Sequence, residues 1–431
     1  MTTTSSGPDT GTGYGRPPSS HNARLTEVGP GTPMGEALRR YWHPIASSNG
    51  LTSDVPHRTK VLGENLIVFR DGRGRAGVVF ERCAHRGSSL YYGRIEEDGI
   101  RCCYHGWKFD VQGRCLEQAC EPDRGRRRDA ARQPWYPVEE RYGLVFVYMG
   151  PPEHKPPLPR YRMLEEFGEG EELFSEIPVP GMNVTGLLTE CNWLQSFENA
   201  MDPVHASWLH YTHSGPQFEG AGEADGFPVS FFDPYALPGA IVYEKSEHGA
   251  LYRQSFQKED PDGGSRKLVW TTECHLPNIV ALPDFVKLRI DQPHDCLIWA
   301  VPCDDTSFRS FVAVRATSIE RLMRIALGIK QNGKYFWEMT EEDAQRYPGD
   351  MEAQTSQGSI TQHSEETLAT TDKGVVMLRR LLSQMVDDVE AGRDPQNVER
   401  GEARAREVLS GLFTEGHTDH HTHPAIAAVP G

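Results

Sequence analysis

Short apolar runs separated by turn residues dominate the chain between residues 45 and 150. Residues 66–69 (Leu-Ile-Val-Phe) and 77–80 (Gly-Val-Val-Phe) flank Asp-Gly-Arg-Gly at 71–74, a pattern typical of a β-hairpin. The same stretch spells G-x-G-x-x-G, but no helical pattern follows it, so we reject a dinucleotide-binding loop. This part of the chain is predicted to be all-β.

Helical patterns appear near the N-terminus and again, in longer segments, after residue 160. A first short amphipathic helix is predicted at 34–42, opened by Thr32 and Pro33 as N-cap and N1 residues. Strands are predicted within 227–318, for example at Ala240-Ile-Val-Tyr, Lys267-Leu-Val-Trp and Phe308–Val314. Together these patterns predict an α+β protein, with an antiparallel sheet covered by helices. The later helices are expected at Cys191–His213, Ile319–Gln331, Lys373–Ala391 and Asn397–Leu412.

These elements divide the chain into two domains and two tails. Residues 1–22 are rich in Thr, Ser, Gly and Pro and are predicted to be a disordered tail. The first domain is expected at 23–155 and the second at 156–413, joined by a proline-rich stretch at 151–159. Residues 414–431, which contain four histidines, are predicted to be a second disordered tail.

Composition narrows the class of protein. The chain has 431 residues and a formal net charge of −16, and no basic run suggests nucleic-acid binding. Its nine cysteines suggest a reducing compartment. The N-terminal segment lacks the apolar region of a signal peptide, and no apolar run reaches bilayer-spanning length. We therefore expect a soluble, cytoplasmic protein.

Two Cys/His pairs carry the strongest chemical signal. Cys83 and His85 form C-x-H, and Cys102 and His105 form C-x-x-H, with sixteen residues between the pairs. This pattern is typical of a [2Fe–2S] cluster with two Cys on one iron and two His on the other, an arrangement that raises the reduction potential. Zinc also accepts Cys2His2 ligands, but zinc fingers usually pair like residues. The flanking sequences resemble the Rieske family, which favours the cluster.

Cys103 makes the second pair locally ambiguous. Rieske sequences usually have Pro at this position. Cys102 gives the C-x-x-H spacing with His105, whereas Cys103 would leave one residue between the ligands. We therefore expect Cys102 to be the ligand and Cys103 to be a small buried thiol.

A second metal pattern lies in the predicted helix 191–213. Asp202, His205 and His210 form D-x2-H-x4-H, and two His with one carboxylate form the facial triad of non-haem Fe(II) oxygenases. Residues five apart point about 140° away from each other on an ideal helix. His205 and His210 can reach one metal only if the helix ends, kinks or forms a π-type turn between them. We expect irregular geometry here.

Together the two motifs resemble the α subunit of a Rieske non-haem iron aromatic ring-hydroxylating oxygenase. More narrowly, the chain is similar to the phthalate 4,5-dioxygenase branch, whose relatives include O-demethylases, over roughly Leu25 to Leu412. The resemblance implies a carboxylate iron ligand far along the chain. Asp372, before Lys373-Gly-Val-Val-Met-Leu, matches that position better than Glu365 or Glu366. Asp372 could instead be an ordinary helix N-cap, which is a common role for Asp.

The resemblance also implies how electrons reach the iron. Asp202 would join His205 to His105 of the partner subunit, which implies a homotrimer or hexamer. The chain has no convincing flavin or nicotinamide motif, so we expect a separate NAD(P)H-dependent reductase of flavin or ferredoxin type. The oxidised molecule would be an aromatic substrate, with O2 as co-substrate. Monooxygenation with O-demethylation of an aromatic acid is favoured, and cis-dihydroxylation of a phthalate-like ring is the alternative.

Few residues are candidates for substrate recognition. Lys245 is the single basic residue between Arg162 and Arg253, so a substrate carboxylate would need a cation from the strands. Arg253 and His213 are the candidate substrate-binding residues, and Asp202 and Asn199 are the candidate catalytic residues.

Proteins of other classes fit less well. A Rieske electron-transfer protein without oxygenase chemistry would need little more than the first domain. A respiratory Rieske subunit would carry further cysteines where this chain has Ser88 and Tyr104. A zinc-stabilised binding module would be colourless, whereas a Rieske protein is red-brown.

Overall fold

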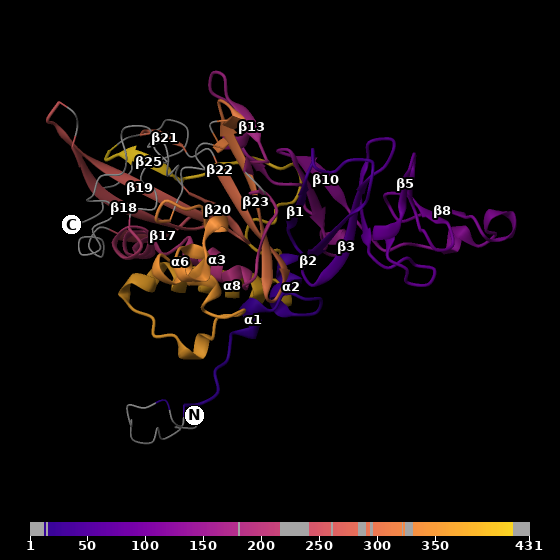
Figure 1. Ribbon diagram of the computed structural model, residues 1–431, viewed down its shortest axis with the longest axis horizontal. Coiled ribbons are helices and arrows are strands. Elements are labelled where there is room, and N and C mark those ends of the chain that lie inside the picture. Colours follow the sequence, from indigo (N-terminus) through magenta and orange to yellow (C-terminus); the bar gives the residue numbers. More distant parts are fainter. Residues whose placement is uncertain are drawn as a thin grey trace.

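The fold comes from a computed structural model. It describes residues 13, 16–179, 182–215, 241–259, 262–282, 290–293, 296–320, 322–323 and 331–416. An arm of small sheets from the first part of the chain extends from a larger body, in which helices lie beside one long sheet (Figure 1). The body and the arm correspond to the expected α+β and all-β parts.

The N-terminal segment joins both parts. The helix α2 (Pro33–Leu38) begins where the sequence predicts, because the Thr32 side chain accepts a hydrogen bond from the Gly35 amide. It ends before Trp42, which already belongs to β1. Met34, Ala37 and Leu38 are buried in the main core, and α2 packs against α8 (Lys373–Glu390) together with the short α1 (Ala23–Thr26).

Three antiparallel sheets build the first part. The predicted hairpin is present as β3 and β4, whose register pairs Phe69 with Gly77. Strand orders are β1-β11-β10, β2-β3-β4-β9 and β5-β6-β7-β8. The strands are β1 (Trp42–Ser47), β2 (His57–Val61), β3 (Glu64–Arg70), β4 (Ala76–Phe80), β5 (Arg94–Glu96), β6 (Gly99–Arg101), β7 (Trp107–Phe109), β8 (Cys115–Gln118), β9 (Trp135–Tyr136), β10 (Val138–Arg141) and β11 (Leu144–Tyr148).

The second part is organised by one ten-stranded sheet. Its main path is β13-β23-β22-β20-β19-β18-β17, and β16, β21 and β25 pair beside it. The longest pairing joins β18 to β19, from Gly249 opposite His275 to Glu259 opposite Ser265. Its strands are β13 (Glu172–Phe174), β16 (Leu187–Thr189), β17 (Ile241–Lys245), β18 (Gly249–Glu259), β19 (Ser265–His275), β20 (Ile279–Ala281), β21 (Gln292–Pro293), β22 (Cys296–Asp304), β23 (Ser307–Ala316) and β25 (Gly411–Thr414); outside it lie β12 (Arg160–Tyr161) with β24 (Ala405–Arg406), and β14 (Pro178–Val179) with β15 (Met182–Asn183).

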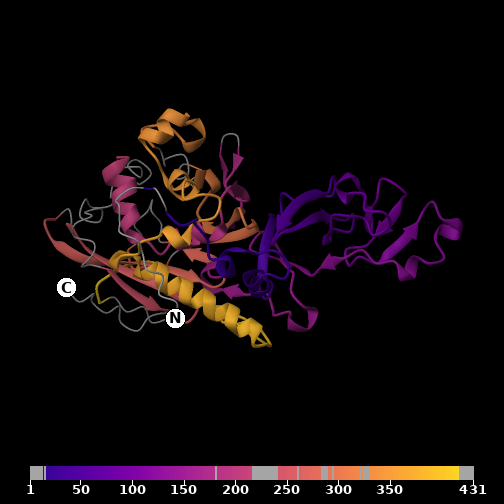
Figure 2. The same ribbon diagram turned by 90° about the horizontal axis from the view of Figure 1, so that it is seen from below.

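Helices cover one side of this sheet. The long helix α8 runs obliquely across the body in Figure 2 and contacts β18. It buries Leu378, Leu382, Met385 and Val386 at helical spacing, as the predicted helix at 373–391 requires. The shorter helices are α3 (Trp193–Asn199), α4 (Pro203–Ser207), α6 (Glu341–Arg346) and α7 (Asp350–Thr355).

The predicted helix at Asn397–Leu412 is wrong. The chain there is extended: Ala405 and Arg406 pair in parallel with β12, and β25 pairs with β19 and β21. Gly401 has a φ of +91°, which interrupts any helix, and the charged residues of this stretch lack an apolar stripe. Sheet pairing therefore outweighed local helix propensity.

Some sequence predictions fall outside the described residues. These are most of the predicted helix Ile319–Gln331, strands before Ile241, residues 1–12 and 14–15 of the first tail and residues 417–431 of the second. Residues 16–22 of the first tail lie against the segment before α8, where the Ser20 amide donates to the Ser364 side chain.

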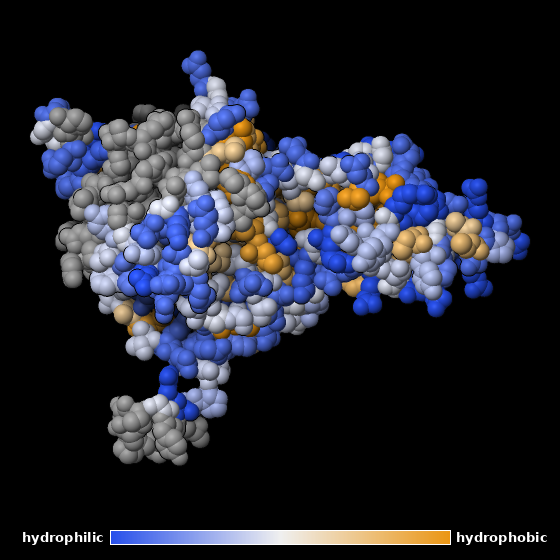
Figure 3. Space-filling view, viewed as in Figure 1, coloured by the Kyte–Doolittle hydropathy of each residue, from blue (hydrophilic) through white to orange (hydrophobic). Residues whose placement is uncertain are grey.

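Hydrophilic residues cover most of the described surface in the view of Figure 3, and the hydrophobic ones gather mainly near the junction of arm and body. No helix in the part of the chain that the structure describes has both the length and the apolar character that a membrane crossing requires.

Candidate metal centres

The first Cys/His pair lies in a tight loop that follows β4. The Cys83 amide donates to the Ser88 carbonyl at 2.8 Å, and the Gly87 amide donates back to the Cys83 carbonyl at 2.8 Å. Gly87 has a φ of +75°, a conformation that a residue with a side chain adopts at a cost. The loop therefore turns the chain sharply around Cys83 and His85.

The second pair lies in a matching loop between β6 and β7. The Cys102 amide donates to the Trp107 carbonyl at 2.8 Å, and the Gly106 amide donates to the Cys102 carbonyl at 3.1 Å. Gly106 has a φ of +70°. The same closing glycine and the same pair of backbone hydrogen bonds thus occur in both loops.

The two loops bring all four predicted ligand side chains together. The His85 and His105 rings meet edge to face with centroids 4.7 Å apart, and His85 stacks on Trp107 at 4.4 Å. Cys83 and Cys102 are buried free thiols. Their mutual hydrogen bond raises the pKa of Cys83 and lowers the pKa of Cys102, so the two sulfurs face each other. This donor set fits a [2Fe–2S] cluster.

Cys103 does not behave as predicted. Its side chain is exposed rather than buried, and its sulfur lies 3.9 Å from the Ser88 hydroxyl. Since Cys102 is already turned inward toward Cys83, the next side chain in the tight loop faces solvent.

The second centre depends on a helix that breaks twice. Helix α3 ends at Asn199, and Asp202 caps α4 by accepting from the Val204 amide at 2.9 Å. A π-helix then runs from Trp208 to His213. The predicted irregular geometry is confirmed, because the wider π turn rotates His210 back toward His205. The imidazole centroids are 5.3 Å apart.

A carboxylate from a distant segment completes the group. The ligand atoms of His205, His210 and Asp350 all lie within 4.8 Å of one another. Asp350, the first residue of α7, has its oxygens 3.6 Å from His205 Nε2 and 3.2 Å from His210 Nε2. Burial raises its pKa, but the hydrogen bond from His210 and both imidazoles outweigh burial and lower the pKa to about 2. Two imidazoles and an ionised carboxylate are a fitting site for Fe(II).

Asn199 and Asp202 hold this group from one side. The Asn199 amide nitrogen lies 3.3 Å from His205 Nε2 and donates to Asp350 at 3.2 Å. The backbone carbonyl of Asp202 accepts from His205 Nδ1, which leaves Nε2 directed toward Asp350 and His210. The Asp202 carboxylate is partly exposed and lies 3.9 Å from His205 Nδ1.

Asp372 is not brought to this group. Its carboxylate accepts from the Ala369 amide at 2.5 Å and so closes the 3-10 turn Thr370–Asp372 that precedes α8, but it makes no capping hydrogen bond to α8 itself. The rivals Glu365 and Glu366 face Arg16 and Arg379 instead. Sequence reasoning missed Asp350, and the only local signal for it is a Pro-Gly-Asp sequence that opens a helix with Glu352 three residues after Gly349.

Neither candidate substrate contact belongs to the group formed by His205, His210 and Asp350. His213 is an exposed residue at the end of the π-helix. Arg253 on β18 forms an ion pair with Glu244 on the neighbouring strand. Their predicted roles stay predictions.

Comparison with known proteins identifies the family. A model of the Rieske [2Fe-2S] domain matches residues 41–132. Over 409 residues the chain is 45% identical to the phenoxybenzoate dioxygenase subunit alpha of Ectopseudomonas oleovorans, covering 94% of each chain. The chain is a Rieske oxygenase α subunit. As a member of this family it is an enzyme, the terminal oxygenase, with a [2Fe–2S] cluster and a mononuclear Fe(II) as cofactors.

Other relatives of this Rieske oxygenase differ in their named substrates. It is 35% identical to the tert-butanol monooxygenase / tert-amyl alcohol desaturase oxygenase subunit of Aquincola tertiaricarbonis (88% of this chain, 79% of the relative). It is 32% identical to the 5,5'-dehydrodivanillate O-demethylase oxygenase subunit of Sphingobium sp. (89% and 83%). The fold matches dicamba monooxygenase with a TM-score of 0.57 at 16% identity, over 82% of this chain and 99% of that one.

Proposed function

We propose that Cys83, His85, Cys102 and His105 hold the cluster, and that His205, His210 and Asp350 hold the iron. The convergence of Asp350 with the two imidazoles is the observation that carries the iron assignment, and it favours Asp350 over Asp372. When bound, the two metal groups supply one-electron transfer and the activation of O2 for attack on carbon. The chain's own residues fix the tautomer of His205, keep Asp350 ionised and hold the carboxylate beside both rings.

The proposed reaction is oxidation of an aromatic acid that carries an ether. Two relatives support it, since one is named for phenoxybenzoate and another for O-demethylation of dehydrodivanillate. In the favoured reaction one oxygen atom enters an ether methyl group: ArOCH3 + O2 + 2e− + 2H+ gives ArOH, formaldehyde and water. In the alternative, both atoms of O2 add to the ring and give a cis-diol. Aliphatic alcohols are the contrasting substrates to test, because one relative is named for tert-butanol and tert-amyl alcohol.

Arg253 and His213 are proposed as substrate contacts. Arg253 would have to exchange Glu244 for the substrate carboxylate, since the two side chains are paired in the structure. His213 is exposed and is the last residue of the π-helix that also carries His210, so it is placed to donate to a polar group of an entering molecule.

We propose that electrons pass between subunits of a homotrimer or hexamer. The loops beside β5 to β8 and the helices around α3 lie in opposite parts of the molecule in both Figures 1 and 2. A path from the cluster of one chain to the iron of another would run from His105 of the partner subunit through Asp202 to His205. The electrons would come from a separate NAD(P)H-dependent reductase. All nine cysteines are free thiols, which supports the proposed cytoplasmic location.

Product analysis by mass spectrometry tests the reaction. Purified protein, a ferredoxin–reductase system and 18O2 would be offered methoxybenzoates, phenoxybenzoates, phthalate and tert-butanol. Loss of methyl with formaldehyde supports O-demethylation. Gain of two labelled oxygens on the ring supports the dioxygenase alternative. Turnover of the alcohol alone would overturn the aromatic-acid proposal.

A further inference from the structure

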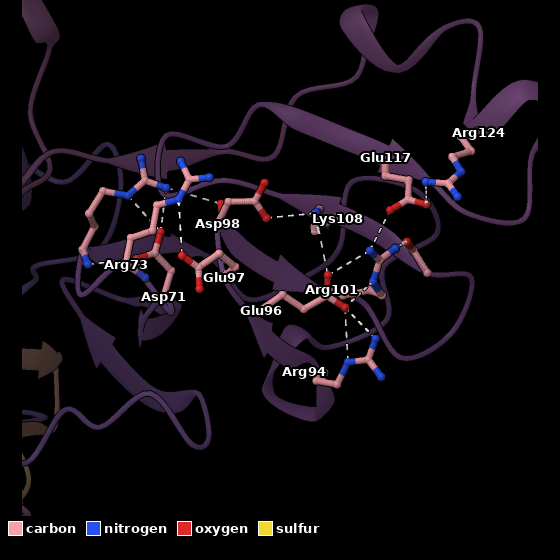
Figure 4. Close-up of polar contacts among 12 residues, drawn as sticks. Asp71, Arg73, Arg94, Glu96, Glu97, Asp98, Arg101, Lys108, Glu117 and Arg124 are labelled. Atoms are coloured by element: carbon pink, nitrogen blue, oxygen red, sulfur yellow. Dashed lines mark hydrogen bonds and ion pairs between the residues drawn. The ribbon is translucent and has the colours of Figure 1, made fainter.

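A charged network underlies the second cluster loop. In the β5–β8 sheet, ion pairs link the strands, as Figure 4 shows: Arg94 and Glu96 lie on β5, Arg101 on β6, Lys108 on β7 and Glu117 on β8. Glu96 is its centre, facing Arg94 and Arg101 at 2.6 Å and Lys108 at 3.7 Å. Arg101 holds the pKa of Glu96 at about 2, so this carboxylate is ionised at neutral pH.

Arg101 connects this network to the loop itself. It directly precedes Cys102, and its Nη1 donates to the Gly106 carbonyl at 2.7 Å. Its remaining donors bind Glu96 through Nε at 2.6 Å and Nη2 at 2.9 Å, and Glu117 through Nη2 at 2.7 Å. The planar guanidinium is thus fixed at three points. It joins Arg101 to Gly106, the two residues that flank the Cys102–His105 turn.

The first cluster loop is held without charge. Gln133, which is fully buried, accepts from the Ala84 amide at 2.8 Å and donates to the carbonyls of Phe80 and Arg82 at 2.8 and 3.0 Å. The two loops therefore have the same backbone hydrogen bonds but differ in the side chain that binds each of them. A neutral amide holds the first loop and a cation holds the second.

We infer that Arg101 positions the loop carrying Cys102 and His105 and, through its charge, raises the reduction potential of the cluster. The reduced cluster has one more negative charge than the oxidised one, so a fixed nearby cation stabilises it. Arg101 is a positioning residue that acts through Gly106 and touches no reacting atom. The inference rests on the proposed cluster ligands.

The test compares Arg101→Gln with Arg94→Gln. Arg94 binds the same Glu96, and its replacement by Gln removes the same charge. Within the described residues, Arg94 makes no hydrogen bond to the Cys102–His105 loop. In a redox titration, the reduction potential of the cluster in Arg101→Gln should lie ~59 mV below that of wild type. For one electron this means that reduction is about tenfold less favourable. Arg94→Gln should shift the potential much less, because its side chain is 75% exposed. Equal shifts in the two variants would overturn the inference.

Arg101→Lys separates charge from position. It should restore most of the potential but alter the EPR g-values, since an ammonium group cannot bind Glu96, Glu117 and the Gly106 carbonyl in one plane. Wild-type g-values in this variant would overturn the positioning role. A wild-type protein without any Rieske EPR signal after reconstitution would refute the ligand assignment instead. A normal signal with no shift in Arg101→Gln would refute only the role of Arg101.

Discussion

The cluster loops and the iron-binding turn use similar side chains on very different backbones. Each cluster loop closes with a glycine at positive φ and the same two backbone hydrogen bonds, so each is built from neighbouring residues. The iron group instead needs a capped helix, a π turn and a carboxylate from a remote helix. A local motif fixes the first geometry, whereas tertiary packing fixes the second.

Among the changes that test this comparison, replacing Asp350 should have the largest effect on iron binding and activity. Asp350→Ala should lose iron and lower kcat/KM by well over the about 100-fold typical of changes in the groups that surround metal ligands. Asp372→Ala should keep iron and cost about 1 kcal/mol of stability, because it removes one hydrogen bond, the one from the Ala369 amide. Metal analysis alongside cluster absorbance measures both. The ligand assignment fails if Asp372→Ala is the variant that loses iron.

This contrast also explains what the sequence could predict. The spacing and flanking sequences of Cys83, His85, Cys102 and His105 predicted one shared cluster site, and their role as its ligands stays a prediction. Two tight loops place the His85 and His105 rings side by side, as that prediction requires. The irregular helix between His205 and His210 could be predicted, because residues five apart on a regular helix cannot both reach one metal. The approach of Asp350 could not be predicted, because it depends on how the chain packs before α7. The helix predicted at 397–412 failed for the same reason, since partner strands decide that segment's structure.

The next largest effect should come from breaking the ion pairs that join α8 to α3, the helix that ends at Asn199 beside the iron group. Arg379 on α8 binds Glu198 of α3 and Glu366, each through two hydrogen bonds of 2.6 to 2.8 Å, and its side chain is 15% exposed. Arg379→Met should lower the free energy of unfolding by about 3–5 kcal/mol, because two carboxylates lose their partner. Urea denaturation of the holoenzyme measures this.

Arg24→Met is the matched control for that change. Arg24 also bridges two carboxylates on α8, Asp387 and Glu390, but at the surface, so its loss should cost less than about 1 kcal/mol. The deficit of Arg379→Met should shrink as the pH falls, since burial raises the pKa of Glu198 and protonation removes the unpaired charge. Equal losses in both variants at neutral pH would mean that burial of the clamp is unimportant.

Asp202→Asn tests the link between the two centres. Asparagine retains an acceptor oxygen for the Val204 amide, so the fold and both metals should survive. Turnover should fall by about 10–100-fold, because the charge proposed to join His205 to the cluster of the partner subunit is lost. Stopped-flow reduction of the cluster by the reductase should be unchanged while its reoxidation by O2 with substrate slows. Wild-type reoxidation would show that no bridge runs through Asp202.

The smallest effects should distinguish the two cluster loops from each other. Gly87→Ala and Gly106→Ala both place a side chain at positive φ, which costs about 1–2 kcal/mol. A Cβ at Gly87 meets nothing within 4 Å, but one at Gly106 would lie 2.8 Å from the Ala119 Cβ. Gly106→Ala should therefore retain less cluster per chain, measured by absorbance and iron content. Adding Ala119→Gly should restore it to the level of Gly87→Ala; no recovery in the double variant would mean that backbone strain, rather than this contact, separates the loops.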